Sequence, residues 1–249
     1  MNTDAAPPPA STEGAKMIYL IARRPTTSRE ELIAHWFAHH MPPVMAAQAR
    51  NRALARAYAW RYWVTLFEAE DATRHGWEGM AELWWTKQPP APPQASGVHP
   101  RDSFQEKAEP YRPWATTEHV VVEGRDRLPL EPSARSTPFP CTRSGFLKIS
   151  FLVAARPDTD YVPFFEHWLG VHVPNVRETL LGAGGLRYVV NLSREPDQEP
   201  YAGLAELYFP DSDAYRRYRE TIKPDGMEQW VDRSRTPVLA GRTQLIGIP

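Results

Sequence analysis

Residues 35–42 read His-Trp-Phe-Ala-His-His-Met-Pro, and residues 167–174 read His-Trp-Leu-Gly-Val-His-Val-Pro. The two stretches align without a gap: the first histidine, the tryptophan, the last histidine and the proline each recur 132 positions later (167 minus 35 for the first pair). A match of this kind indicates that one structural unit is used twice along the chain.

Two further blocks repeat in the same order. An Arg-Tyr pair at residues 61–62 recurs at 187–188, and Gly-Met-Ala-Glu-Leu at 79–83 recurs as Gly-Leu-Ala-Glu-Leu at 203–207. The segments between blocks are longer in the first copy, as is usual where insertions fall in loops. We expect four parts in the chain: a flexible tail at residues 1–15, a first domain at 16–123, a proline-rich linker at 124–144 and a second domain at 145–249.

Each copy begins with an apolar strand followed by a helix. In the first copy the strand covers residues 17–23, and Ser28 with Glu31 forms a capping box for a helix that runs to residue 40, where two prolines close it. Later strands and a second helical region complete the order β-α-β-β-α-β, the split βαβ unit. In the second copy we expect this helical region as two helices, at residues 213–221 and 226–233. The sequence therefore predicts an α+β fold of two ferredoxin-like units, each with a four-stranded antiparallel sheet and helices on one face.

The predicted strand at residues 58–68 carries large apolar side chains on both of its faces. Antiparallel sheets that face water usually show one polar face, and this strand does not. We therefore expect the two sheets to pack face to face within the chain.

The composition excludes several classes of protein. Lys plus Arg is 29 and Asp plus Glu is 30, so no basic field is available to attract nucleic acid or an anionic membrane. The single cysteine, Cys141, favours a reduced, cytoplasmic setting. The N-terminus has no signal-peptide pattern, and no apolar run approaches the roughly 20 residues that span a bilayer.

The motifs together resemble the EthD-like family. The resemblance rests on three features that each occur twice: an opening apolar strand, a helix with His-Trp-x4-His-x-Pro and a Gly-x-Ala-Glu-Leu strand. The resemblance implies a dimeric α/β-barrel, here closed within one chain by the duplication, with the homo-oligomeric state left open. It also implies action on a small aromatic or polyketide-like compound. The first hypothesis is a cofactor-independent lyase or dehydratase with acid-base histidines. A non-catalytic small-molecule-binding or accessory protein and a cofactor-free monooxygenase are the alternatives.

His40 and His172 are the first candidates for catalysis. Each falls within the apolar face of its helix, and imidazole titrates near neutral pH, so each suits a general acid or base. A core histidine bonded to a helix carbonyl is the alternative. His35 and His167 lie on the flank of the same helices as candidates for substrate binding, although packing is the favoured interpretation.

Glu82 and Glu206 lie in apolar strands, where a lone carboxylate would be costly to bury. They are candidates for catalysis, but an ion pair across strands with Arg61 or Arg187 is the favoured interpretation. Tyr62 and Tyr188 are further candidates for catalysis, because each could offer its phenol to a ligand oxygen, although a cross-strand packing role is the alternative. The remaining candidates for substrate binding are Trp36, Trp168, Arg61, Arg187 and Asn191.

Neither a metal nor a cofactor is expected. His35 and His39 have the spacing of two metal ligands, but the glutamate of the His-Glu-x-x-His motif is missing and Val171 replaces His39 in the second copy. Haem occurs on related barrels, but the sequence singles out no axial ligand.

Overall fold

The computed structural model describes residues 9–128 and 144–249, which form two compact units. The first unit consists of Glu13–Thr116, Leu239–Pro249 and Ser144, and the second consists of Gly145–Val238 with residues 9–12 and 117–128. Two long strands contribute to both units, so the predicted boundaries at residues 123 and 145 stay a prediction. Cys141 and most of the predicted linker lie outside the described residues.

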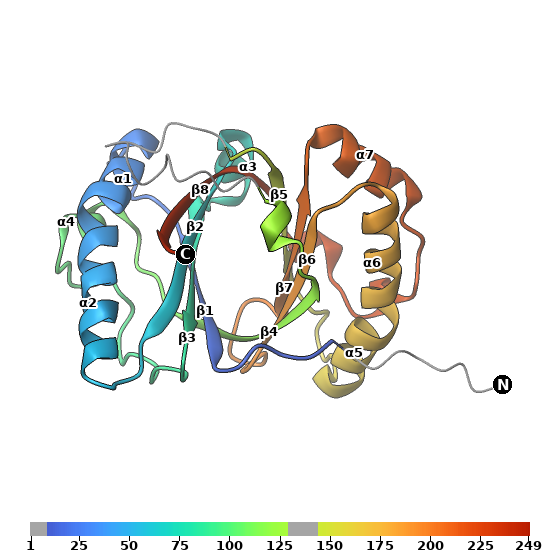
Figure 1. The fold of residues 1–249 in the computed structure, drawn as a ribbon, viewed down its shortest axis with the longest axis horizontal. Coiled ribbons are helices and arrows are strands. Elements are labelled where there is room, and N and C mark those ends of the chain that lie inside the picture. The colour runs from blue at the N-terminus through green and yellow to red at the C-terminus, as the bar shows by residue number, and fades with distance from the viewer. Residues whose placement is uncertain (1–8, 129–143) are drawn as a thin grey trace. The chain divides into compact units, whose positions relative to one another are not determined.

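The first unit is built on an antiparallel sheet (Figure 1). Its strands pair in the order β4-β1-β3-β2, as expected of a split βαβ unit, and β8 from the end of the chain pairs with β2. The sequence did not anticipate this last pairing. The strands are β1 (Ala15–Ile21), β2 (Ala59–Phe67), β3 (Gly79–Trp85), β4 (Trp114–Val122) and β8 (Val238–Ile248).

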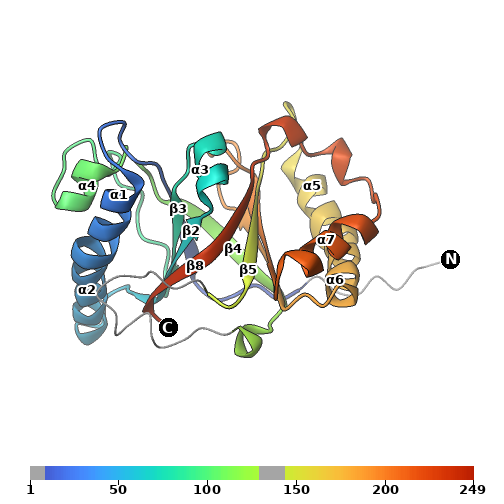
Figure 2. The ribbon, with the colours of Figure 1, turned by 90° about the horizontal axis from the view of Figure 1, so that it is seen from above.

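Helices α1, α2 and α4 cover one face of this sheet (Figures 1 and 2). The predicted cap is confirmed, since the Ser28 side chain accepts a hydrogen bond from the Glu31 amide at 3.1 Å. The helix does not end at residue 40: a π-helical segment carries the chain into α2. The helical elements are α1 (Arg29–His35), η1 (Trp36–His40), α2 (Met41–Ala53), α3 (Ala69–His75) and α4 (Ser103–Lys107).

The two prolines that were expected to close the helix lie instead in the first turn of α2. A proline has no amide hydrogen to donate, which is harmless in a first turn but breaks the hydrogen-bond ladder further on. The wider π turn shifts the bonding pattern just before Pro42 and Pro43, so the chain stays helical through them. Pro174 occupies the same place in the second repeat.

The second unit repeats this plan. Its antiparallel strands pair in the order β5-β7-β6, and the predicted helix at residues 213–221 is confirmed as α7. The expected helix at 226–233 is wrong, because short 3₁₀ turns occupy that segment. The elements are β5 (Leu147–Val153), α5 (Tyr161–His167), η4 (Trp168–His172), α6 (Val173–Gly182), β6 (Arg187–Ser193), β7 (Gly203–Phe209), α7 (Ser212–Thr221), η5 (Met227–Gln229) and η6 (Arg233–Arg235), with η2 (Arg125–Arg127) after β4.

A tryptophan and a glycine bring helix and sheet together in each unit. Trp36 and Trp168 are buried, and a Cβ on Gly79 or Gly203 would come within 3.1 or 3.0 Å of the respective indole. The same Cβ would lie only 2.7 or 2.5 Å from a carbonyl oxygen of the neighbouring strand. This close approach explains why the Trp and the Gly recur together in both copies.

The prediction of an α+β fold with antiparallel sheets and ferredoxin-like strand order is thus confirmed at this level. Within the described residues, no helix is both long enough and apolar enough to cross a membrane.

Candidate functional site

Each repeat places a histidine at the end of a π-helical segment. His40 ends η1 and His172 ends η4. π-helical turns are rare, since their hydrogen bonding is less favourable than that of an α-helix, and they are found frequently at functional sites. The two repeats preserve this costly feature at the same position.

His172 is paired with a carboxylate that other groups hold in place. Its Nδ1 lies 2.7 Å from Oδ2 of Asp225, which also accepts a hydrogen bond of 2.7 Å from Nδ2 of Asn175. The other oxygen of Asp225 accepts from the Met227 amide, and Asn175 donates to the Lys223 carbonyl. Burial raises the pKa of Asp225, but the hydrogen bonds from His172 and Asn175 outweigh it and hold that pKa well below its usual range.

His40 forms the corresponding pair in the first unit. Its Nδ1 lies 3.1 Å from Oδ2 of Asp102, the N-cap residue of α4, and its ring stacks on Phe104 with 4.4 Å between centroids. Burial lowers the pKa of His40, although the hydrogen bond to Asp102 opposes this effect. Pro43 stands where the second repeat has Asn175, so no amide steadies this carboxylate from α2.

A carboxylate at Nδ1 fixes the tautomer of an imidazole and leaves Nε2 with its lone pair. Both imidazoles are largely but not wholly buried, with exposed fractions of 17% for His40 and 24% for His172. The arrangement suits an acceptor or donor of one proton or hydrogen bond.

His35 and His167 lie apart from these pairs, on the flank where the sequence placed them. The ring of His35 lies 5.1 Å from that of His39, and His167 lies against Trp230 with 6.3 Å between centroids. One ring nitrogen of each is buried without a hydrogen-bond partner in the described part of the chain. These contacts agree with packing, and a role in substrate binding stays a prediction.

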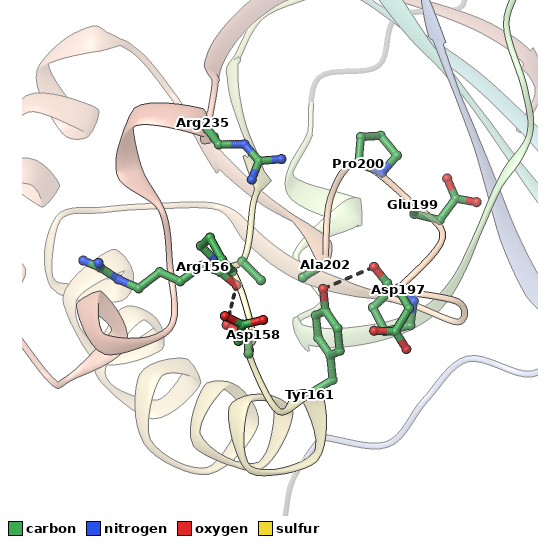
Figure 3. A pocket seen from close by; sticks show the side chains of 12 residues that line it. Arg156, Asp158, Tyr161, Asp197, Glu199, Pro200, Ala202 and Arg235 are labelled. Carbon is green, nitrogen blue, oxygen red and sulfur yellow. Dashed lines mark hydrogen bonds between the residues drawn. The ribbon is translucent and has the colours of Figure 1, made fainter.

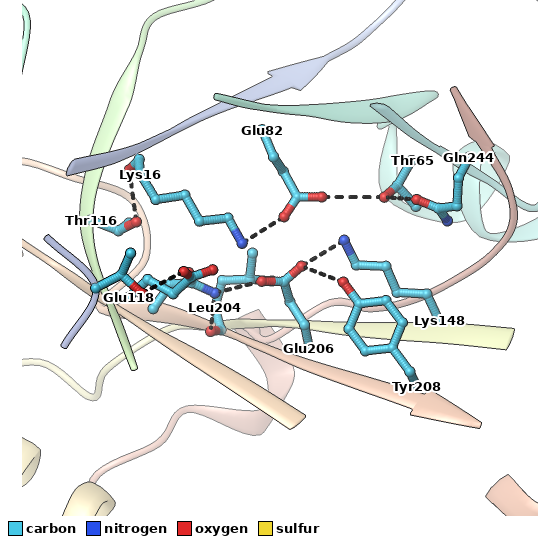
Figure 4. Close-up of polar contacts among 12 residues, drawn as sticks. Lys16, Thr65, Glu82, Thr116, Glu118, Lys148, Leu204, Glu206, Tyr208 and Gln244 are labelled. Carbon is cyan, nitrogen blue, oxygen red and sulfur yellow. Dashed lines mark hydrogen bonds and ion pairs between the residues drawn. The ribbon is translucent and has the colours of Figure 1, made fainter. Parts of the chain in front are cut away.

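The buried glutamates pair with lysines, so the predicted Arg–Glu pairs are wrong (Figure 4). Lys148 Nζ lies 2.6 Å from Glu206, and Lys16 Nζ lies 2.7 Å from Glu82, with all four side chains at most 1% exposed. The lysine of each pair comes from the first strand of its repeat, which runs beside the glutamate strand.

The two arginines take other partners. The guanidinium of Arg61 lies among indoles, 4.5 Å from the ring of Trp60 and 5.2 Å from that of Trp84. Arg187 is paired with the carboxylate of Glu123 at 3.0 Å, and also donates to its carbonyl. Arg61 is therefore engaged by aromatic rings and Arg187 by Glu123, and the buried glutamates pair with the lysines instead.

Three side chains that were predicted to contact a ligand form hydrogen bonds within the protein instead. Trp36 Nε1 donates to the Tyr62 hydroxyl at 3.2 Å, and Asn191 Nδ2 donates to Glu206 at 2.8 Å. Burial raises the pKa of Tyr62, and raises that of Tyr188 well above its ordinary value, so neither phenol is poised as an acid. Trp168 is buried beside Tyr188 in the core of the second unit.

A pocket of about 330 Å³ opens at the N-terminal end of α5, the end opposite to His172 (Figure 3). The loop after β5 and the loop between β6 and β7 form its walls. It contains none of the predicted site residues. Its lining consists of Ala155, Arg156, Pro157, Asp158, Thr159, Tyr161, Pro196, Asp197, Glu199, Pro200, Ala202 and Arg235.

Sequence reasoning missed Lys16, Lys148, Asp102 and Asp225. The lysines were detectable, because Lys148 follows Lys16 by the same 132 positions as the histidines (148 minus 16) and both interrupt apolar strands. The aspartates were not, because they lie in the region where the copies diverge. Among the described residues, no group of three or more His, Cys, Asp and Glu side chains could hold a metal ion.

Comparisons with known proteins find structural likeness only. No family model matches the sequence. No curated protein matches it either. The chlorite dismutase of Candidatus Nitrospira defluvii in complex with imidazole matches with a TM-score of 0.51 and 7% identity, over 93% of this chain and 91% of that chain. An arginine-to-lysine mutant of that enzyme matches with a TM-score of 0.50 and 7% identity, over 93% and 92%.

A heme-binding protein from Thermus thermophilus matches over 95% of this chain and 93% of that chain, with 12% identity. Its TM-score of 0.39 is too low to indicate more than a distant likeness.

The resemblance to the EthD-like family is therefore wrong, because the structures of matching fold are chlorite dismutases, a different family. The function that was inferred from it is wrong as well. The lyase or dehydratase reaction loses its basis, and neither the accessory-protein nor the monooxygenase alternative gains one. At this identity the likeness establishes one point: the chain has the fold of the chlorite dismutases.

Proposed function

We propose that this protein binds a small polar molecule at His172 and exchanges a proton with it. The observation that carries the proposal is the 2.7 Å contact between His172 Nδ1 and Asp225, with Asn175 fixing the same carboxylate oxygen. A carboxylate held in this way stabilises an imidazole that gains a proton at Nε2. The π-helical segment that ends at His172 supports a functional role for this residue.

His172 is a stronger candidate than His40. The second unit supplies an additional hydrogen bond to the aspartate through Asn175, and its imidazole is more exposed. His40 is covered on one side by Phe104, and its lowered pKa favours the neutral form. We assign His40 a structural role at the junction of η1 and α4.

Haem does not fit the described pocket. A porphyrin needs a flat, apolar slot and an axial ligand such as histidine, cysteinate or tyrosinate. The pocket after β5 is polar and contains no histidine or cysteine, and the hydroxyl of its tyrosine, Tyr161, donates to the Pro196 carbonyl at 3.2 Å. No step of the proposed function passes through haem.

Several expectations from the sequence stay predictions. They are the packing of both sheets into one intrachain barrel, the cytoplasmic location, the homo-oligomeric state and the lack of nucleic-acid and membrane partners. Binding of a small molecule is compatible with each of these predictions.

The test combines a ligand screen with proton counting. A library of small polar compounds is screened by thermal shift, since a ligand that binds the folded state raises the unfolding midpoint. Hits are then titrated by calorimetry in two buffers of different ionisation enthalpy, which reports the protons taken up or released. We expect a hit whose binding is coupled to a proton in the wild type.

His172→Gln should abolish this coupling, whereas His99→Gln, a change at an exposed histidine, should leave it intact. Proton-coupled binding that survives in His172→Gln would refute the assignment.

A further inference from the structure

The pocket after β5 has a rigid frame. Thr159 Oγ1 donates to the Arg156 carbonyl at 2.8 Å, and the Tyr161 hydroxyl donates across the opening to the Pro196 carbonyl at 3.2 Å. The side chain of Arg156 donates to the Glu228 carbonyl at 3.1 Å and points away from the opening (Figure 3). Prolines at three lining positions restrict the loops further. The pocket is thus largely preformed.

Three charged side chains around the pocket have no partner among the described residues. Arg235, Asp158 and Asp197 make no side-chain hydrogen bond or ion pair with the residues that the structure describes. Arg235 lies on one side of the opening, and the two aspartates lie on other sides of it (Figure 3). Asp158 is held with a φ of 59°, in the left-handed region that few non-glycine residues adopt. Strain of this kind is often found at binding sites.

Tyr161, which lines the pocket, is influenced by charged groups of both signs. Burial and the carboxylate of Asp197 raise the pKa of Tyr161, while the guanidinium of Arg235 opposes them. Charges of opposite sign therefore act on one phenol from within the same pocket.

We propose that this pocket binds a small zwitterion of amino-acid size, with its carboxylate on Arg235 and its ammonium group between Asp158 and Asp197. A guanidinium binds a carboxylate through two parallel hydrogen bonds, which a lysine cannot provide. Carboxylates are acceptors only and match the three donors of an ammonium group. A volume of about 330 Å³ lies at the lower end of the range for small-molecule sites.

The charge of the lining excludes other classes of ligand. The lining contains three acidic residues, and of its two arginines only Arg235 is directed toward the opening, so a nucleotide or another multiply charged anion would meet net repulsion. A flat apolar compound would leave the charged groups desolvated and unpaired. The proposal does not depend on the role of His172, which lies beyond the other end of α5.

The test uses the full chain and matched probes. Isothermal titration calorimetry compares free amino acids with their C-terminal amides, which lack the carboxylate, and with their N-acetyl derivatives, which lack the ammonium group. We expect at least one free amino acid to bind at least about tenfold more tightly than either derivative, since each derivative loses one set of charge-assisted hydrogen bonds.

Variants locate the site. Arg235→Gln should weaken binding of the free amino acid at least about tenfold and leave binding of its amide unchanged. Asp158→Asn keeps a residue that tolerates positive φ, and should weaken the free amino acid but not the N-acetyl derivative. Arg216→Gln, at an exposed arginine on α7, is the control and should bind normally.

His172→Gln should also bind normally, which separates this proposal from that of the previous section. The proposal would be overturned if no free amino acid bound. It would also be overturned if the amide and N-acetyl derivatives bound as tightly as the free amino acid. Unchanged binding in Arg235→Gln would move the site elsewhere and overturn it as well.

Discussion

Lys148 Nζ lies 2.6 Å from Glu206 Oε1, and neither side chain is exposed to solvent. Glu206 accepts further hydrogen bonds from Asn191 and the Tyr208 hydroxyl, at 2.8 and 3.2 Å (Figure 4). Removing two charges from water costs several kcal/mol each, and only close, well-bonded partners repay this cost. The pair is therefore sensitive to the loss of either member.

Removing the lysine should destabilise the protein strongly. Lys148→Met leaves the carboxylate of Glu206 buried without its cation, and we expect a loss of about 3–5 kcal/mol in the free energy of unfolding. Adding Glu206→Gln should restore part of it, because the remaining amide is neutral. Urea unfolding measures both changes. The exposed Lys87→Met serves as control, and a loss below about 1 kcal/mol in Lys148→Met would show that the charge pair matters little.

Alanine at Gly203 should disturb the contact between η4 and the sheet. Its Cβ would lie 3.0 Å from the indole of Trp168 and 2.5 Å from the Asn191 carbonyl, so we expect a loss of about 1–3 kcal/mol from overpacking. At Gly170 a Cβ meets nothing within 4 Å, so Gly170→Ala should be neutral or stabilising. Thermal unfolding of the two variants compares them directly. Equal midpoints would mean that the indole moves aside without cost.

The pair of Asp225 and His172 should make stability depend on pH in the acid range. Burial raises the pKa of Asp225 but its hydrogen bonds lower it more, so the folded pKa lies below the unfolded value of about 3.9. A depressed carboxyl pKa adds stability that is fully present above the unfolded pKa and is lost as pH falls through the folded pKa. Asp225→Asn should therefore be less stable than the wild type at pH 6, with the difference shrinking below about pH 4. A constant difference across this range would contradict the lowered pKa.

His40 should titrate at lower pH than an exposed histidine. Burial lowers its pKa despite the partner Asp102. The stability that depends on the neutral ring is then present above the unfolded pKa of about 6.5 and is lost as pH falls through the folded pKa. Nuclear magnetic resonance titration of the imidazole protons gives the midpoints, with His99 as the exposed reference. A midpoint for His40 at or above that of His99 would show that the attraction of Asp102 exceeds the effect of burial.

The sequence predicted what is local and repeated. The Ser28 cap and the strands around Glu82 and Glu206 follow from patterns within a few residues. The pairing of β8 with β2 could not be predicted in this way, because internal similarity locates strands but does not choose their neighbours.

Only the histidines of the candidate site could be predicted from the sequence. The periodicity of the helix singled out His40 and His172, but their partners Asp102 and Asp225 come from segments with no recognisable repeat. The ion pairs were assigned to arginines expected on the neighbouring strand, since no pattern in the sequence shows which of two cations reaches a buried carboxylate. The family was misassigned because short motifs that pack a helix on a sheet record the fold rather than the chemistry.

The π-helical segments give each repeat one place where the chain can lose a residue without rotating the helices on either side. A π-helical turn contains about one residue more than an α-helical turn. Deleting Ala38 or Gly170 would remove this extra residue and turn the bond between the Met41 amide and the Trp36 carbonyl, or its counterpart in the second repeat, into an ordinary α-helical bond. The flanking helices would then keep nearly the same orientation. A deletion within α2 or α6 would instead rotate every later residue of that helix by about 100°.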